Sequence, residues 1–206
     1  MARQVDYRKR EEIAQAAFEI LRSKGFQKTS MSEIAKALGM KRPTLYWYFK
    51  DIGAIFETLL VRLMLDVGIH MEAHIREVNH PIDRLFAQIK AVDDFFATRE
   101  SLIPCLLQLW AATGAGVDPE GAVAMTRSAF EPRRQLQIES VRAGIREGLI
   151  DDCDPEALVH LINSYIDGML VQRISHPETS LPPVHDLIWT KLLNPLKLNP
   201  IDQEAS

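Results

Sequence analysis

Ser30-Met-Ser-Glu-Ile-Ala-Lys-Ala-Leu-Gly-Met-Lys-Arg-Pro-Thr-Leu-Tyr-Trp-Tyr-Phe49 is the stretch that decides the fold of this chain. Ser30 and Glu33 have the S-x-x-E spacing of a capping box, which satisfies free backbone amides at a helix start. Gly39 stands where a left-handed residue commonly ends a helix, and Pro43 suits the first turn of a following helix. The stretch therefore predicts two short helices joined by a tight turn.

The second of these helices is expected to bury one face and to expose the rest. Leu45 and Phe49 are four residues apart, so both can face a core. The other positions are polar or aromatic: Thr44, Tyr46, Trp47 and Tyr48. A helix-turn-helix has this design, because its second helix must lie in the major groove of DNA. From the pattern alone, an ordinary helical hairpin with an aromatic edge remains the alternative.

Charge is segregated along the chain. Residues 1–52 hold 11 Lys and Arg against 6 Asp and Glu, a net charge of +5, whereas residues 53–206 hold 13 against 22, a net charge of −9. Phosphate contacts supply much of the affinity of a protein for DNA, so a basic segment on an acidic body is typical of a DNA-binding head. The acidic body should repel DNA, which favours docking by the head alone.

Several elements of this segment form a known pattern: Ile13-x3-Ala17, Lys24-Gly25-Phe26, Thr29-Ser30-Met31-x2-Ile34-Ala35, Leu38-Gly39-Met40 and Thr44-Leu45-Tyr46-x-Tyr48-Phe49. With them, residues 8–60 resemble the DNA-binding domain of the TetR family of bacterial transcriptional regulators. That family usually has a Lys just after the start of its fourth helix, where it meets a DNA phosphate. This chain has Ile52 there, followed by Gly53, so that contact is missing or is supplied by Lys50 or Lys41.

The resemblance implies a DNA-contacting surface on the second helix of the motif. Thr44 and Tyr46, early in that helix, are the candidates for contacts to base edges, with Pro43 and Trp47 on the same surface. Other side chains would mainly position the phosphates: Lys28, Ser32, Lys41, Arg42, Tyr48 and Lys50.

The rest of the chain reads as further helices, and the predicted class is all-α with about nine helices. A three-helix DNA-binding domain is expected over residues 1–50 and a helical effector-binding and dimerisation domain over residues 51–206. Asp51 is a good cap for a helix that begins after it. Pro132 is expected to kink or split a helix over about 119–147.

The last two predicted helices, about 155–175 and 184–197, carry more apolar surface than one side of a terminal helix needs. The resemblance implies that they pair with a second copy in a four-helix bundle, and an intramolecular core is the alternative. A two-fold dimer would present two recognition helices to major grooves about 34–36 Å apart. The candidate interface residues are Leu158, Leu161, Ile162, Tyr165, Met169, Leu187 and Leu192.

The helices between the DNA-binding domain and the last two predicted helices are the expected binding site of a small-molecule effector. Large and adaptable apolar side chains among helices suit an apolar ligand, although plain core packing explains each residue taken singly. The resemblance carries this expectation more than any residue does. The candidate ligand-binding residues are Val67, Met71, Phe96, Trp110 and Phe130.

Other classes of function find little support in the sequence. Asp66, His70 and His74 recur every four residues but lack a fourth metal ligand, so no metal and no cofactor is expected. We find no catalytic motif, and Cys105 and Cys153 make no disulfide framework. No signal peptide or membrane-spanning stretch is visible, which predicts a cytoplasmic protein that binds no membrane.

The sequence therefore predicts a homodimeric transcriptional regulator, foremost a repressor, that a small apolar molecule releases from a palindromic double-stranded DNA operator. The alternative is a structural, nucleoid-type DNA-binding protein that responds to no effector, since its DNA-binding head would look the same.

Overall fold

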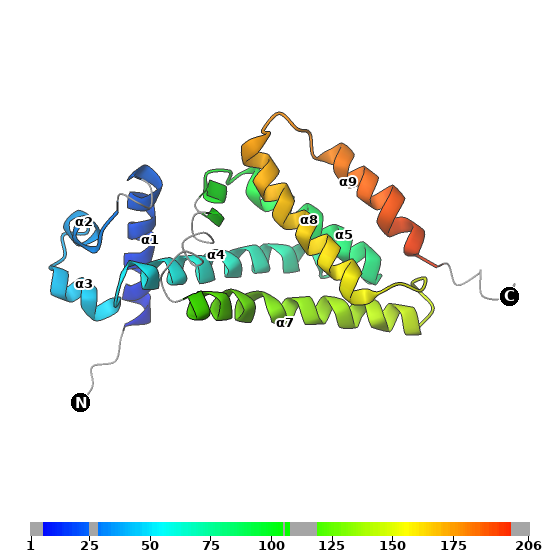
Figure 1. Ribbon diagram of the computed structural model, residues 1–206, viewed down its shortest axis with the longest axis horizontal. Coiled ribbons are helices and arrows are strands. Elements are labelled where there is room, and N and C mark those ends of the chain that lie inside the picture. Colours follow the sequence, from blue (N-terminus) through cyan, green and yellow to red (C-terminus); the bar gives the residue numbers. More distant parts are fainter. Residues whose placement is uncertain (1–5, 25–28, 105, 108–118, 199–206) are drawn as a thin grey trace, which may run out of the picture. The chain divides into compact units, whose positions relative to one another are not determined.

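The computed structural model describes residues 6–24, 29–104, 106–107 and 119–198. The all-α prediction is confirmed: across these ranges the elements are helices, and β-type pairing is limited to an isolated bridge between Ile150 and Lys197. Figure 1 shows the helices α1 (Tyr7–Lys24), α2 (Met31–Ala37), α3 (Arg42–Tyr48), α4 (Ile52–Ile75), α5 (Pro81–Ala97), α7 (Pro119–Arg146), α8 (Pro155–Ser175) and α9 (Pro182–Ile188). A π-helical turn, Trp189–Leu193, and a 3-10 turn, Asn194–Leu196, follow α9.

The chain divides into two compact units, and boundaries between them fall within α4, before Pro104 and within α7. The N-terminal unit comprises Met1–Asp66 and Pro104–Thr126, and the C-terminal unit comprises Val67–Ile103 and Arg127–Ser206. The functional division expected between residues 50 and 51 stays a prediction, because compactness alone does not identify a DNA-binding segment. None of the described helices is both long and apolar enough to cross a lipid bilayer.

Local hydrogen bonds define the start and the end of α2. The Ser30 backbone N–H donates to Glu33 Oε2 over 2.9 Å, and the Glu33 N–H donates to Ser30 Oγ over 3.3 Å, which confirms the capping box. Gly39 has a φ of 63°, and after it the Met40 N–H donates to the Ala35 carbonyl over 2.8 Å. A left-handed residue thus ends α2 and turns the chain toward α3.

The core of the N-terminal unit joins residues that are far apart in sequence. α1, α2, α3 and the first turns of α4 all contribute fully buried side chains, among them Ile13, Ala17, Ile34, Leu45, Phe49 and Ile55. Asp51 caps α4 as expected, since its Oδ1 accepts the Ala54 N–H over 2.8 Å. This core fixes the position of α3 and therefore the direction of its exposed side chains.

The core of the C-terminal unit is built by α5, α7, α8 and the π-helical turn. Its fully buried members include Ile82, Ile89, Ile138, Val141, Ile162 and Leu193. The sequence predicts a kink or a split at Pro132; α7 runs unbroken through this residue, so the split does not occur, and the kink stays a prediction. Gly144 has a packing reason: a Cβ at this position would lie 2.5 Å from Ile150 Cδ1.

Ion pairs connect the elements of the C-terminal unit. The Arg173 guanidinium on α8 binds Asp93 on α5, with Nε donating to Oδ1 over 3.0 Å, and the Lys197 ammonium binds Asp83 over 2.8 Å. His185 on α9 is buried beside the first of these pairs, its Nδ1 4.0 Å from Asp93 Oδ2. Its Nε2 is buried without a hydrogen-bond partner.

Gly39 is expected to tolerate asparagine better than alanine. No atom lies within 4 Å of a Cβ built there, so the cost of a side chain comes from the left-handed backbone and not from a clash. Gly39→Ala should lower the free energy of unfolding by about 1 kcal/mol. Gly39→Asn should cost less, because asparagine visits this conformation more readily. Urea titrations followed by circular dichroism would measure both; equal losses would contradict the conformational explanation.

Stability is expected to fall as the solution is acidified through the histidine range. Burial lowers the pKa of His185; Lys90 and Arg173 lower it further, and Asp93 and Asp186 oppose the shift. Near pH 6.5 the unfolded chain takes up a proton that the folded chain resists. The contribution of the neutral His185 to the free energy of unfolding is therefore complete above this pH and is lost as the pH falls below it.

Urea midpoints between about pH 7.5 and about pH 5.5 would measure this loss. His185→Gln removes the titrating group and should reduce the loss, whereas His160→Gln, at an exposed position on the neighbouring α8, should leave it unchanged. A similar pH dependence in His185→Gln and the parent protein would rule His185 out as the cause.

Candidate functional site

α3 presents a polar and aromatic face to solvent because its apolar residues point inward. Leu45 is fully buried and Phe49, directly after the helix, is 1% exposed. With that face fixed, Thr44 is exposed, and the Tyr46 and Trp47 side chains are 44% and 42% exposed. Large aromatic side chains this exposed, side by side on one helix, are typical of a surface that a partner covers.

Positive charge surrounds this face. Lys41, Arg42 and Lys50 are exposed, and residues 34–50 contain no Asp or Glu. The Arg42 guanidinium lies over the Tyr46 ring, 5.9 Å from its centroid, and the Trp47 and Tyr48 rings meet edge to face at 4.6 Å. These contacts restrict the conformations of the Arg42, Tyr46, Trp47 and Tyr48 side chains. The surface can therefore offer an anionic polymer both cations and flat apolar groups.

Most of the residues predicted to contact DNA lie on this surface or beside it. Pro43 and Thr44 are exposed in the first turn of α3, and Tyr48 is half-buried at its last turn. Ser32 is half-buried on α2, and Lys28 lies outside the described residues. Ile52, in the place of the usual lysine, is half-buried in the first turn of α4. Their contacts with DNA stay predictions.

The predicted ligand-binding residues that the structure describes lie on α4, α5 and α7. Val67, Met71 and Phe96 are buried, Phe130 is exposed, and Trp110 lies outside the described residues. The Arg133 guanidinium contacts this group, since its Nη1 donates to Met71 Sδ over 3.4 Å. Their role in effector binding stays a prediction.

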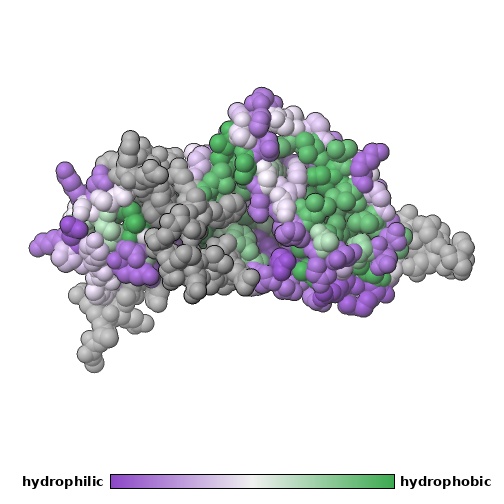
Figure 2. Space-filling model, viewed as in Figure 1, coloured by the Kyte–Doolittle hydropathy of each residue, from purple (hydrophilic) through white to green (hydrophobic). Residues whose placement is uncertain are grey.

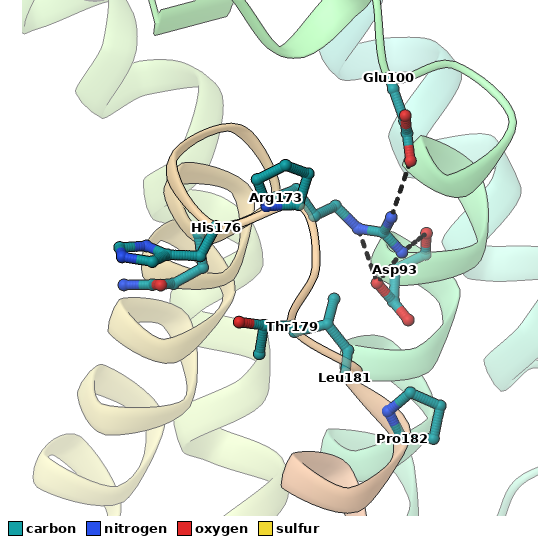
Figure 3. Close-up of a pocket in the computed structure, with 9 residues that line it drawn as sticks. Asp93, Glu100, Arg173, His176, Thr179, Leu181 and Pro182 are labelled. Atoms are coloured by element: carbon teal, nitrogen blue, oxygen red, sulfur yellow. Dashed lines mark hydrogen bonds and ion pairs between the residues drawn. The ribbon is translucent and has the colours of Figure 1, made fainter.

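A small polar pocket of about 210 Å³ lies between the end of α8, the start of α9 and α5 (Figure 3). Figure 3 shows the Arg173 guanidinium directed toward Asp93 and Glu100, which take up its hydrogen-bonding capacity. None of the predicted ligand-binding residues lines this pocket. Its polar walls do not suit the apolar effector that the sequence predicts.

The predicted dimer residues fall into two groups. Leu158, Ile162 and Met169 are buried in the C-terminal unit itself, and Tyr165 and Leu192 are half-buried against the same core. Leu161 and Leu187 are 50% and 58% exposed, and Val171 and Ile174, which the sequence analysis did not single out, are exposed on α8 as well. Hydrophobic surface gathers over α8 and α9 (Figure 2). These four exposed residues form what we call the α8/α9 apolar face.

The sequence analysis also missed the polar groups inside the C-terminal unit. Gln137 on α7 and Gln88 on α5 are buried and hydrogen-bonded to each other, and the Asn163 amide on α8 donates to Gln137 Oε1 over 3.1 Å. Arg133 lies one turn before Gln137 on the same helix. The helical phase of Arg133, Gln137 and Val141, spaced by four, is the signal that could have placed Arg133 on an inward face.

The three residues weighed as metal ligands serve other contacts. Asp66 pairs with Arg62 over 3.2 Å, and His74 Nδ1 lies 2.8 Å from the carbonyl oxygen of His70. His70 packs against Phe95 with its Nε2 buried and unpartnered. No group of three or more metal-ligating side chains occurs among the residues that the structure describes.

Comparisons with known proteins agree with this geometry. The family described as "Bacterial regulatory proteins, tetR family" matches residues 13–59, the part that contains α2 and α3. The chain is 28% identical over 95 residues to YvdT of Bacillus subtilis, named an uncharacterised helix-turn-helix transcriptional regulator. That alignment covers 46% of this chain and 42% of the relative. The chain spans less than half the length of the curated relatives it matches.

Solved structures resemble nearly the whole chain. A TetR transcription regulator from Haloarcula marismortui has a TM-score of 0.76 at 18% identity, over 94% of this chain and 100% of that chain. FadR from Bacillus subtilis, solved in complex with stearoyl-CoA, has a TM-score of 0.72 at 20% identity, over 88% and 98%. At these identities the likeness shows the fold. The match of residues 13–59, the curated relatives and this fold together support the TetR family of bacterial regulatory proteins as the family that this chain resembles.

Proposed function

We propose that this chain is a ligand-responsive transcriptional repressor that binds a palindromic operator as a homodimer and leaves it when a small molecule binds. One observation carries the proposal: burial of Leu45 and Phe49 aims the other side chains of α3 outward as a polar and aromatic surface with cations around it. A recognition helix needs this division between an anchored face and a reading face. The match of residues 13–59 to the tetR family of bacterial regulatory proteins supports the same interpretation.

The roles of the α3 residues follow from where they stand. Thr44 and Tyr46 are exposed on the early part of the helix, where side chains of a recognition helix reach base edges in the major groove. Lys41, Arg42 and Lys50 flank them and would neutralise phosphates, which fixes the position of the head without reading sequence. Lys50 stands two residues before Ile52 and can supply the phosphate contact that Ile52 cannot make.

Dimerisation is proposed through the α8/α9 apolar face. Leu161, Val171 and Ile174 on α8 and Leu187 on α9 expose apolar surface that a second copy would bury. A symmetric pairing uses the same face on both copies, which suits a palindromic operator with two equivalent half-sites. Leu158, Ile162 and Met169 would then support the interface from within the chain.

An effector would act by changing the relative populations of the DNA-bound and the free arrangement of the dimer. A ligand can shift DNA affinity only by the difference between its affinities for the DNA-bound and the free arrangement. α4 belongs to both compact units, so a ligand that contacts its C-terminal half would act on a helix that also reaches the N-terminal unit. An effector-independent DNA-binding protein would show no such response.

Substitutions on α3 should separate reading from positioning. Thr44→Ala should weaken binding to the specific operator more than to random duplex, because base contacts discriminate by about 1–3 kcal/mol. Arg42→Ala should weaken both about equally and reduce the salt slope of binding by about one. Lys191→Ala, an exposed cation far along the sequence, is the control for loss of charge. Operator affinities unchanged in both α3 variants would contradict the docking proposal; fluorescence anisotropy at several salt concentrations measures them.

Charges on the α8/α9 apolar face should break the dimer and leave the fold intact. In the double variant Leu161→Glu, Leu187→Glu, both carboxylates are solvated in the monomer but would be buried unpaired in the dimer, at several kcal/mol. Leu136→Glu changes an exposed leucine of α7 and should leave the dimer intact. Light scattering gives the oligomeric state and circular dichroism the fold. A dimer of normal affinity in the double variant would place the interface elsewhere.

A further inference from the structure

A positive charge faces inward on α7. Gln137, Val141 and Gly144 follow Arg133 at helical spacing, and all three are buried. Arg133 itself is half-buried, one turn nearer the start of the same face. Arginine seldom occupies such a position unless something pairs with it, because removing a guanidinium from water is costly.

The Arg133 guanidinium is held against α4. Its Nη1 donates to Met71 Sδ over 3.4 Å, and its Nη2 lies 2.9 Å from the place where a Cβ at Gly68 would stand. The absence of a side chain at Gly68 therefore leaves the space that the guanidinium occupies. Both contacts lie within the C-terminal unit.

No carboxylate among the described residues forms an ion pair with Arg133. Its recorded hydrogen bond goes to a thioether sulfur, which is a weak acceptor. Burial lowers the pKa of Arg133, and the charge of Glu72, which is not within ion-pair distance, opposes the shift only in part. The other arginines near it on α7 are satisfied: Arg134 binds Glu131, and Arg142 binds Glu139 and Glu156.

Apolar residues lie on both helices near this charge. Val67 and Met71 on α4 are buried, and Phe130 precedes Arg133 by one turn on α7 and is exposed. A site with one fixed cation and apolar walls suits a ligand with one anionic group and an apolar body. A single guanidinium, with Glu72 adding negative charge to the field, balances one negative charge and not the two of a phosphate.

We propose that Arg133 binds the carboxylate of an apolar monocarboxylate, which is the effector of this regulator. The planar guanidinium can donate two parallel hydrogen bonds to a carboxylate, a geometry that fixes the orientation of the ligand. The apolar body of the ligand lies along Met71 and Phe130. This inference rests on the proposed function, since it names the chemical class of the effector that the proposed function requires.

Calorimetric titration of the full chain with decanoate and with methyl decanoate tests the proposal. Decanoate should bind about tenfold or more tightly than the uncharged ester, because a hydrogen-bonded charge is lost in the ester. Arg133→Met keeps the length of the side chain and removes its charge, so it should abolish the preference for decanoate. Arg133→Lys should keep part of it. Arg134→Met, on the next residue of α7, is the control and should bind both probes as the parent chain does.

A second variant tests the geometry without removing the charge. In Gly68→Ala the new Cβ meets the guanidinium, which must move, so decanoate should bind more weakly while methyl decanoate changes little. Thermal melts establish that each variant is folded. Arg133→Met should be at least as stable as the parent chain, since it removes a charge that has no counter-ion.

Three outcomes would overturn the proposal: equal affinity of the parent chain for acid and ester, an unchanged preference for decanoate in Arg133→Met, or no binding of either probe. Operator binding, measured separately, keeps the two proposals apart. Operator DNA released by an uncharged compound but not by decanoate would leave the proposed function standing and remove the carboxylate. Failure to bind any palindromic duplex would remove the proposed function whatever the calorimetry shows.

Discussion

Packing of Leu45 and Phe49 into the core of the N-terminal unit is the interaction on which the DNA-binding surface depends. α3 has seven residues, far fewer than the roughly 12–15 that an isolated helix needs to be stable in water. The stability of α3 and its orientation about its own axis therefore come from burial of these two side chains, worth about 1.5–3 kcal/mol each. Because helical geometry is fixed, the same burial turns Thr44, Tyr46 and Trp47 outward. The exposed polar and aromatic side of α3 therefore follows from the burial of its apolar side.

Several buried polar groups of the C-terminal unit are hydrogen-bonded to one another. Gln88, Gln137 and Asn163 satisfy one another across three helices, and Arg173 is held by Asp93. Arg133 differs from these groups, because its recorded hydrogen bond goes to a thioether sulfur. Proteins retain costly charges where function uses them, so a counter-ion that arrives with a ligand is a physical reason for Arg133 to be there.

The α8/α9 apolar face and the pocket near Arg173 lie in the same unit but differ in chemistry. The face consists of exposed aliphatic side chains, which gain free energy only when another surface covers them. The pocket is lined mainly by charged and polar residues, among which Arg173 is hydrogen-bonded to Asp93 and Glu100. The first therefore favours association with a second copy, and the second favours rigidity between α5, α8 and the start of α9.

The sequence by itself determined the elements whose causes are local. The Ser30–Glu33 capping box, the left-handed turn at Gly39 and the Asp51 cap each depend on residues within a few positions of one another, so spacing alone predicts them. The resemblance of residues 8–60 to the TetR DNA-binding domain likewise came from short local motifs. Tertiary structure decided which apolar residues of α8 are covered: Leu158 and Ile162 pack in a core with α5, α7 and the π-helical turn, whereas Leu161 stays exposed. Periodicity marks a helix face as apolar but cannot say what packs on it, and it cannot say that an arginine lacks a carboxylate partner. Those properties arise from segments distant in the chain, which only the folded arrangement brings together.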